Sequence, residues 1–205
     1  MLERRDVFRR ILEVPKVYST FQNLVGARAT RQCLVDNVLK IRPGDRVLDV
    51  GCGPADILEF LPEVNYLGID YSADYIDAAR RRFGDRGRFL AVDVGSLKDQ
   101  GEGDFDVVMA LGVLHHLDDA SAAGLMRDVR ASLKPGGRFL CIDPLIEYPQ
   151  NPIARLLARL DRGQFVRTLD GYSALARSAF DEFLVEPRRD LLRVPYSHAI
   201  TRCTG

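Results

Sequence analysis

Three aspartates stand at regular intervals in the sequence, and each one comes at the end of a short apolar run. Asp49 lies within RVLDV, Asp70 follows NYLGI and Asp93 follows RFLAV. Apolar runs of this kind are typical of buried parallel strands, and open α/β sheets bind ligands at the carboxyl ends of their strands. A carboxylate there can accept hydrogen bonds from the hydroxyl or amino groups of a ligand. The spacing therefore indicates one binding site built from neighbouring strand ends.

A glycine-rich turn, Gly51-Cys52-Gly53-Pro54-Ala55-Asp56, follows the first of these runs. Glycines let backbone amides approach a ligand, and an acidic residue about 20 residues later is typical of a ribose site. A dinucleotide fingerprint would have its last glycine where this chain has Asp56, which we expect to favour a helix N-terminus instead. That negative charge would repel a pyrophosphate, and a Walker lysine is missing. The turn favours a ribose-bearing ligand without phosphates, and NAD and FAD fit poorly.

Alternating strand-like and helix-like segments must position these residues. Strands are predicted at 46–50, 65–69, 88–92, 105–111 and 138–142, and helices at 3–14, 19–40, 55–61, 72–84, 118–133, 152–160 and 172–178. The alternation after residue 45 predicts an α/β fold with a doubly wound, mostly parallel sheet and helices on both faces. Two further strand-like segments, 180–186 and 191–203, are most simply a C-terminal antiparallel hairpin.

Length and composition indicate one cytoplasmic domain. The 205 residues are 46% hydrophobic, and 29 basic residues balance 29 acidic ones. This balance gives no field that would attract nucleic acid or an anionic membrane, and no apolar run reaches the about 18 residues of a membrane helix. The charged N-terminus lacks the apolar core of a secretory signal, and the four dispersed cysteines are expected to be reduced thiols. We expect a single domain over 1–205, with an N-terminal helical lid (1–40) and a substrate-side insertion (144–178).

Five segments resemble, in order and spacing, the successive motifs of class I S-adenosylmethionine (SAM)-dependent methyltransferases. They are VLDVGCGPAD, YLGIDYS, AVDVGSL, DFDVVMALGVLHHLDD and LKPGGRFLCIDP, and they cover roughly residues 40–145. The resemblance is to the type 11/12-like small-molecule subgroup. It implies a seven-stranded sheet, SAM as cofactor and S-adenosylhomocysteine as product.

The resemblance assigns the first and fourth motifs to the methionine end of the cofactor. Asp49 would help to hold this end, while Gly51 and Gly53 would pack their backbones against the cofactor. Ala110 and Leu111, at the end of the fourth predicted strand, would line the same end.

The second and third motifs are assigned by the resemblance to the adenosine. Asp70 would accept from both ribose hydroxyls, with Tyr71 beside the adenine. Asp93 would accept from the adenine amino group, and Val94 would offer its backbone amide. Each acid alone has an alternative role as a helix N-cap or a loop carboxylate. The occurrence of three at successive strand ends favours the binding role.

Two histidines, His115 and His116, follow the fourth predicted strand. Methyl transfer needs alignment and exclusion of water, and an O- or N-nucleophile that starts protonated also needs a base. In similar family members the first position faces cofactor and substrate, so His115 is the expected catalytic base, whereas His116 is expected to be structural. The alternative is that both bond backbone groups of the loop. Related quinone-type O-methyltransferases place glutamates with a histidine here to bind a metal; this chain lacks those glutamates, so no metal is expected.

Acceptor recognition is expected outside the matched core, from residues 18–29 and 143–172. The second segment contains DRGQFVR, whose polar groups and arginines could recognise a carboxylate, a phosphate or sugar hydroxyls. The alternative is a salt-bridged surface turn. The residues expected to touch the acceptor are Tyr18, Arg162, Gln164 and Arg167. Family members with a similar stretch are often enzymes of natural-product or surface-polysaccharide pathways.

The sequence therefore predicts a SAM-dependent methyltransferase that acts on a small molecule. O-methylation is favoured because His115 offers a base, and N- or C-methylation is the alternative. A non-catalytic SAM-binding protein is a further alternative, against which the intact motifs count. A nucleotide-dependent oxidoreductase is disfavoured by Asp56 and by the antiparallel tail. The expected partner is a small-molecule acceptor, without nucleic acid or membrane insertion, and the expected state is a monomer or homodimer.

Overall fold

The computed structural model describes residues 27–151, 154, 164–191 and 196–205. The helix expected at 3–14, most of the one expected at 152–160, and Tyr18 and Arg162 lie outside these residues. Among the described residues, no helix combines the length and the apolar character needed to cross a membrane.

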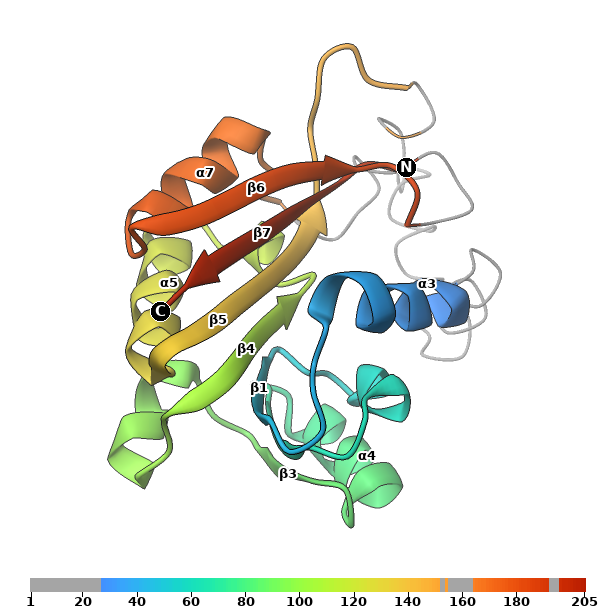
Figure 1. Ribbon diagram of the computed structural model, residues 1–205, viewed down its shortest axis with the longest axis vertical. Helices are drawn as coiled ribbons and strands as arrows, with labels where there is room; N and C mark the ends of the chain where they lie inside the picture. The colour runs from blue at the N-terminus through green and yellow to red at the C-terminus, as the bar shows by residue number, and fades with distance from the viewer. Residues whose placement is uncertain (1–26, 152–153, 155–163, 192–195) are drawn as a thin grey trace, which may run out of the picture.

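A seven-stranded sheet forms the centre of the fold, in the order β3-β2-β1-β4-β5-β7-β6 (Figure 1). The strands are β1 (Arg46–Val50), β2 (Asn65–Ile69), β3 (Gly87–Leu90), β4 (Phe105–Leu111), β5 (Leu133–Pro144), β6 (Glu182–Arg188) and β7 (His198–Thr204). All neighbouring pairs from β3 to β5 are parallel, whereas β7 is antiparallel to both β5 and β6. The predicted fold class, including the antiparallel pairing of the last two strands, is confirmed.

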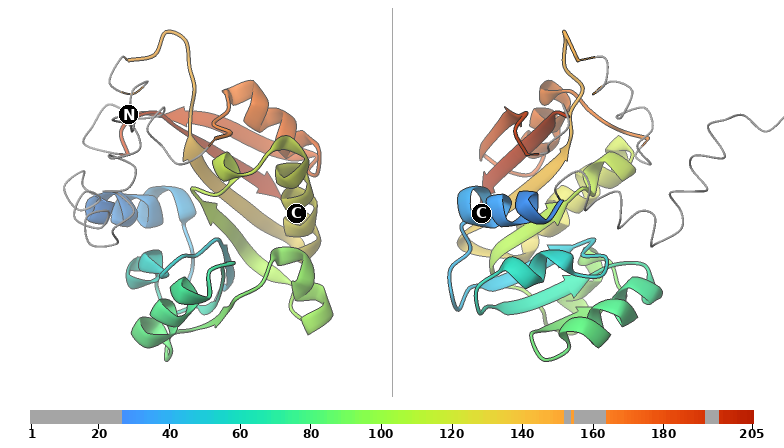
Figure 2. Two further views of the ribbon diagram at one scale, coloured as in Figure 1. Left: turned by 180° about the vertical axis from the view of Figure 1, so that it is seen from behind. Right: turned by 90° about the vertical axis from the view of Figure 1, so that its right-hand side faces the viewer.

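Helices and short helical turns cover both faces of the sheet. They are α3 (Ala27–Leu34), η1 (Val35–Leu39), η2 (Asp56–Phe60), α4 (Ala73–Phe83), η3 (Val94–Gln100), η4 (Leu114–His116), α5 (Asp119–Ser132) and α7 (Leu169–Arg177). One apolar cluster packs η1, η2 and α4 against the sheet, and another packs η3, α5 and α7 against the opposite face. Figure 2 shows α5 and α7 in front of the sheet when the molecule is seen from behind.

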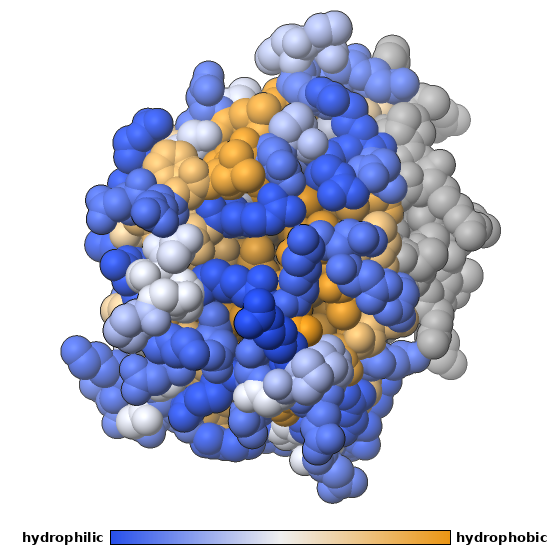
Figure 3. Space-filling view, in the orientation of Figure 1, coloured by the Kyte–Doolittle hydropathy of each residue, from blue (hydrophilic) through white to orange (hydrophobic). Residues whose placement is uncertain are grey.

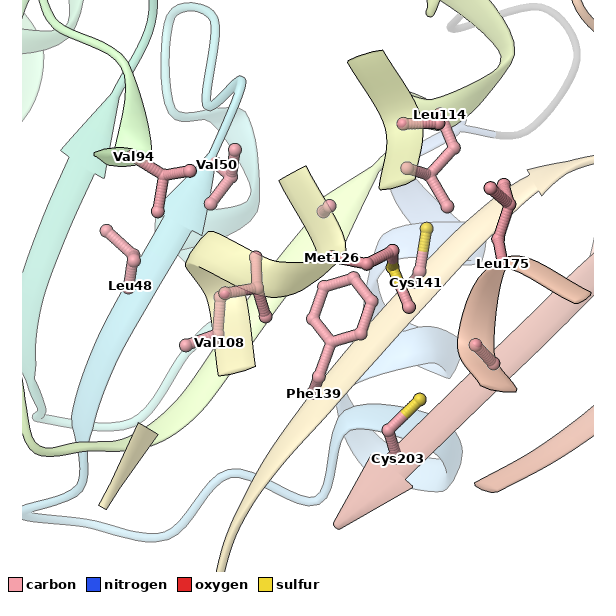
Figure 4. Close-up of a cluster of buried hydrophobic side chains, with 14 of the residues drawn as sticks. Leu48, Val50, Val94, Val108, Leu114, Met126, Phe139, Cys141, Leu175 and Cys203 are labelled. Carbon is pink, nitrogen blue, oxygen red and sulfur yellow. The ribbon is translucent and has the colours of Figure 1, made fainter. Parts of the chain in front are cut away.

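The second cluster is the larger one and is centred on β4 and β5 (Figure 4). Val108 and Phe139 come from neighbouring strands, and Met126 and Leu175 reach them from α5 and α7. Phe139 and Met126 are both fully buried. Burial of side chains of this size stabilises the fold by about 1.5–3 kcal/mol each relative to exposure, which holds α5 against β4 and β5.

Local signals in the sequence set the helix starts. Ser72 accepts a hydrogen bond from the Tyr75 amide at the start of α4, and Asp118 does the same for the Ser121 amide at the start of α5. Serine and aspartate are favoured N-cap residues, and of the adjacent acids Asp118 and Asp119 it is Asp118 that caps α5. The helix expected at 55–61 is instead the short 3₁₀ turn η2, because Ala55 is left-handed (φ 58°) and Pro62 follows closely.

The face of the molecule that carries α3 has apolar surface broken up by hydrophilic side chains (Figure 3). Leu184 of β6 is 54% exposed, and Arg202 of β7 pairs with Glu186 of β6 at 2.5 Å. The order of the strands in the sheet reverses direction between β1 and β4. In open α/β sheets ligands bind at such a switch point, beyond the carboxyl ends of the strands.

Candidate active site

A cavity of about 920 Å³ lies at the carboxyl ends of β1, β2 and β4, at the switch point of the sheet. Its lining is strongly acidic and includes Asp49, Asp56, Asp70, Asp93 and Asp128. Among the lining residues that the structure describes, Arg31 is the only lysine or arginine. It pairs with Asp56 at 3.1 Å. The negative field of these acids favours a ligand with positive charge and disfavours a diphosphate.

The glycine-rich turn forms the floor of this cavity through backbone conformations that side chains rarely adopt. Gly51 has φ +67° and Gly53 has φ +53°, both in the left-handed region. A Cβ on Gly51 would lie 2.8 Å from Cγ2 of Val113, which also lines the cavity. The close approach of the two loops therefore requires glycine at position 51.

Asp70 connects the glycine-rich turn to the start of α4. The Gly53 amide donates to its Oδ2 at 3.0 Å, and the Ser72 amide donates to its Oδ1 at 2.8 Å. Tyr71 beside it is 81% exposed at the rim of the cavity. Asp70 thus orients the turn and still contributes a carboxylate to the cavity lining.

Asp93 combines the two roles that the sequence leaves open. Its Oδ1 accepts from the Ser96 amide at 2.9 Å, which caps η3, and the residue also lines the cavity. The next residue, Val94, is buried and lines the cavity as well. An N-cap and a ligand contact are therefore compatible at this position.

Asp49 is the most deeply buried of the lining acids, with 2% of its surface exposed. The Tyr66 hydroxyl donates to its Oδ2 at 2.6 Å. Burial raises the pKa of Asp49 to about 7, the hydrogen bond from Tyr66 opposes this rise, and the charge of Asp70 adds to it. Leu111 at the end of β4 also lines the cavity, whereas Ala110 is fully buried and is not among the described lining residues.

The two histidines lie in the turn η4, and their positions differ from the expectation. His116 is exposed and lines the cavity, whereas His115 is 5% exposed and is not among the described lining residues. His115 lies directly behind the lining, because a Cβ on Gly112 would be 3.6 Å from its Cε1. The two rings lie side by side, with centroids 4.0 Å apart, so the buried ring of His115 is next to the exposed ring of His116, an arrangement that the sequence motif does not specify.

Asp143 at the end of β5 holds His115 in place. Its Oδ1 is 2.7 Å from His115 Nδ1 and accepts from the His115 amide at 3.1 Å. Its Oδ2 accepts from the Cys141 thiol at 2.8 Å. Asp143 is 1% exposed, so this carboxylate is satisfied inside the protein.

Arg167, expected to touch the acceptor, has a different position. It is 9% exposed, and its guanidinium donates to the carbonyls of Leu114 and Leu117 at 2.8 and 2.7 Å and to Asp119 at 2.8 Å. These bonds fasten the segment around residue 167 to the histidine turn. Gln164 is exposed, in agreement with either a substrate contact or a surface turn.

A family model described as a methyltransferase domain matches residues 48–139, which include the glycine-rich turn and the three aspartates. The chain carries a class I SAM-dependent methyltransferase domain.

Relatives of this methyltransferase domain are longer than the chain. Phosphoethanolamine N-methyltransferase 1 of Triticum aestivum is 30% identical over 192 residues, which cover 90% of this chain and 38% of that protein. An uncharacterized 37.1 kDa protein in transposon TN4556 of Streptomyces fradiae is 31% identical over 173 residues, with 78% and 49% covered. The chain thus spans less than half the length of these curated relatives.

Solved structures share the fold of the methyltransferase domain. The S-adenosylmethionine-dependent methyltransferase SibL has a TM-score of 0.71 at 19% identity, over 95% of this chain and 60% of that one. Phosphoethanolamine N-methyltransferase 2 of Haemonchus contortus, in complex with phosphomonomethylethanolamine and S-adenosylhomocysteine, also has a TM-score of 0.71, at 14% identity, over 100% and 60%.

Sequence reasoning about this methyltransferase domain missed Arg31, Tyr66 and Asp128, as well as His116 as a lining residue and Asp143 as the partner of His115. Tyr66 reads as one more aromatic residue in a buried strand, and its contact with Asp49 depends on strand register. Asp143 could have been found, because it comes directly after the predicted strand 138–142, as Asp70 and Asp93 come directly after theirs. Among the described residues, no three His, Cys, Asp or Glu side chains are grouped so that they could hold a metal ion.

Proposed function

We propose that this domain binds SAM in the acidic cavity and transfers its methyl group to a small-molecule acceptor. The observation that carries the proposal is the convergence of Asp49, Asp70 and Asp93 on one cavity beside a glycine-rich turn. The cofactor suits this lining, because its sulfonium and ammonium groups are cationic and it has no phosphates. When bound, SAM supplies an activated methyl group, so the protein mainly has to orient the reactants and exclude water.

In the proposed arrangement the methionine end lies against Asp49, Gly51, Gly53 and Leu111. The adenosine lies at the other side of the cavity, with the ribose hydroxyls on Asp70. The adenine lies between the rim residue Tyr71 and the pair Asp93 and Val94. Ala110 supports this site from inside the sheet. The alternation of small glycines and acids around the cavity supports this order, because the carboxylates can accept from every donor group of the nucleoside.

We propose O-methylation with His115 as the base. Support comes from the buried contact of 2.7 Å between Asp143 and His115 Nδ1. When Asp143 accepts from Nδ1–H, Nε2 carries the lone pair of the neutral ring and can take the proton of an acceptor hydroxyl. His116, which lines the cavity, is the competing base. N- and C-methylation are the alternatives, because the similar proteins include phosphoethanolamine N-methyltransferases and a cyclopropane-fatty-acyl-phospholipid synthase of Escherichia coli.

The whole of residues 1–205 is proposed to act as one domain, with residues 1–40 as a lid and 144–178 as the acceptor side. Tyr18, Arg162 and Gln164 are proposed acceptor contacts, whereas the contacts of Arg167 favour a positioning role. The four cysteines are free thiols, which supports a cytoplasmic location. We propose a monomer or homodimer with no nucleic-acid partner and no membrane insertion, in a natural-product or surface-polysaccharide pathway.

Calorimetric titration with SAM, S-adenosylhomocysteine and NAD tests the cofactor directly. The proposal requires micromolar binding of the two sulfur ligands and none of NAD, and heat from NAD alone would overturn it. Release of S-adenosylhomocysteine is then measured with a panel of phenols, carboxylic acids, sugars, amines and phosphoethanolamine. Binding without turnover on every acceptor would favour a non-catalytic SAM-binding protein. With an active acceptor, His115→Ala should abolish most turnover and His116→Ala should not; the reverse result would move the base to His116.

A further inference from the structure

Tyr66 reaches Asp49 because strand β2 has a glycine, Gly68, opposite that acid. In the parallel register, Val47 of β1 pairs with Tyr66 and Asp49 pairs with Gly68. Residues two apart in a strand face the same side, so the Tyr66 ring and the Asp49 carboxyl group project from the same face of the sheet. Because Gly68 has no side chain opposite Asp49, the ring can lean along the strand and place its hydroxyl 2.6 Å from Oδ2.

Two glycines are needed for this position of the ring. A Cβ on Gly68 would lie 3.0 Å from Cε1 of Tyr66 and 2.9 Å from the sulfur of Cys52. A Cβ on Gly87 would lie 2.8 Å from Cδ1 of the same ring. Phe89 packs against the ring from β3, with centroids 5.8 Å apart. The ring is therefore enclosed on three sides, and its hydroxyl is held on Asp49.

The surroundings of Asp49 otherwise oppose a negative charge. Burial is the largest effect and raises its pKa to about 7, and Asp70 at the end of β2 adds to the rise. Cys52, in the turn after β1, is a neutral thiol because burial and the two acids raise its pKa above the physiological range. On the other side β4 presents the apolar Met109 in register with Asp49. Arg31 lines the same cavity, and its guanidinium pairs with Asp56. Of these groups, only the hydroxyl of Tyr66 donates a hydrogen bond that favours the Asp49 anion within the described contacts.

We infer that Tyr66 is a positioning residue for cofactor binding, which holds the Asp49 carboxyl group in place and available as an anion for the cationic methionine end of SAM. The inference rests on the proposed position of that end at Asp49. Near neutral pH the free protein carries Asp49 partly protonated. Binding of a cation beside it favours the carboxylate, so the proton leaves to the solvent, and SAM affinity falls as the pH falls below about 7.

The test is calorimetric titration of SAM between pH 6 and pH 9 with the wild-type protein, Tyr66→Phe and Tyr172→Phe. Tyr172 is the matched control, because it is also buried and donates its hydroxyl to the protein, at the Pro144 carbonyl. Loss of a hydrogen bond to a charged group should raise the midpoint of the pH profile by about one pH unit in Tyr66→Phe. From a midpoint near 7, this makes binding roughly fivefold weaker at pH 7 and within about twofold of wild type at pH 9. Tyr172→Phe should follow the wild-type profile.

Either of two results would overturn the inference. The first is a pH profile of SAM affinity for Tyr66→Phe that superimposes on that of the wild type. The second is an affinity that is lower by the same factor at every pH, which would indicate a packing role for Tyr66. Asp49→Asn separates this failure from failure of the proposed site. If Asp49→Asn binds SAM as the wild type does at pH 9, Asp49 is not in the cofactor site at all. If Tyr66→Phe does not fold, the wild-type protein is titrated with SAM at pH 6.5 in two buffers of different ionisation enthalpy. The binding heats should then differ between the buffers, because Asp49 releases a proton, and this release should be absent at pH 9. Equal heats in the two buffers at pH 6.5 would overturn the inference.

Discussion

Replacing Asp70 by alanine should weaken SAM binding by roughly tenfold to a hundredfold. In the free protein the two carboxylate oxygens already accept from the Gly53 and Ser72 amides, at 3.0 and 2.8 Å, so the group is fixed before the ligand arrives. A carboxylate has further lone pairs for the ribose hydroxyls. Hydrogen bonds to charged groups contribute about 1.5–3 kcal/mol, and 1.4 kcal/mol corresponds to about tenfold in affinity.

Calorimetry with SAM, at a pH above 8 where Asp49 is ionised, measures this change without the need for an acceptor. Asp74→Ala is the matched control, because Asp74 is an exposed acid in the first turn of α4. Asp70→Asn keeps one acceptor oxygen and should fall between wild type and Asp70→Ala. Thermal unfolding of each variant distinguishes loss of the ligand contact from loss of the fold. A dissociation constant for folded Asp70→Ala within twofold of wild type would refute the assignment of Asp70 to the ribose.

Three further substitutions test other parts of the site. Gly51→Ala should lower the free energy of unfolding by about 1–2 kcal/mol, the cost of a left-handed non-glycine residue, and should also weaken SAM binding. The control Gly44→Ala, at φ +86° in an open turn, should lower stability alone. An equal loss of SAM affinity in both variants would contradict the role of the glycine-rich turn. Asp93→Ala should lose about 1 kcal/mol in urea unfolding with the cap of η3 and also lose SAM affinity, whereas Asp93→Ser should restore the cap but not the affinity. Asp143→Ala should lower the free energy of unfolding by about 1–3 kcal/mol, because it leaves the buried Nδ1–H and amide of His115 without their acceptor; a loss under about 1 kcal/mol in urea would show that the contact is weak.

The features that follow from short stretches of sequence could be predicted. The N-caps Ser72 and Asp118 act on amides three residues ahead, and the strands carry their own apolar runs. The convergence of Asp49, Asp70 and Asp93 follows from the rule that parallel strands end at one edge. These predictions need only the local sequence and one general rule of topology.

Contacts between distant segments could not be predicted in the same way. Arg167 lies in a stretch rich in charge and looks like a surface residue, yet carbonyls about 50 positions earlier surround it. Tyr66 reaches Asp49 only because the register sets Gly68 opposite that acid. The directions of His115 and His116 depend on the turn η4, whose three residues have no periodic pattern from which a face can be read.

The bonds of Arg167 have a consequence for how such a domain can diversify. They join the stretch before α7 to the histidine turn, and the Phe165 amide adds a bond of 3.0 Å to the His115 carbonyl. Gln164 and Phe165, by contrast, expose their side chains. If the proposed acceptor side is at this segment, substitutions at these two positions would change it while Arg167 keeps the histidine turn in place. In the proposed arrangement, acceptor preference could therefore change without disturbing the bonds that hold the histidine turn.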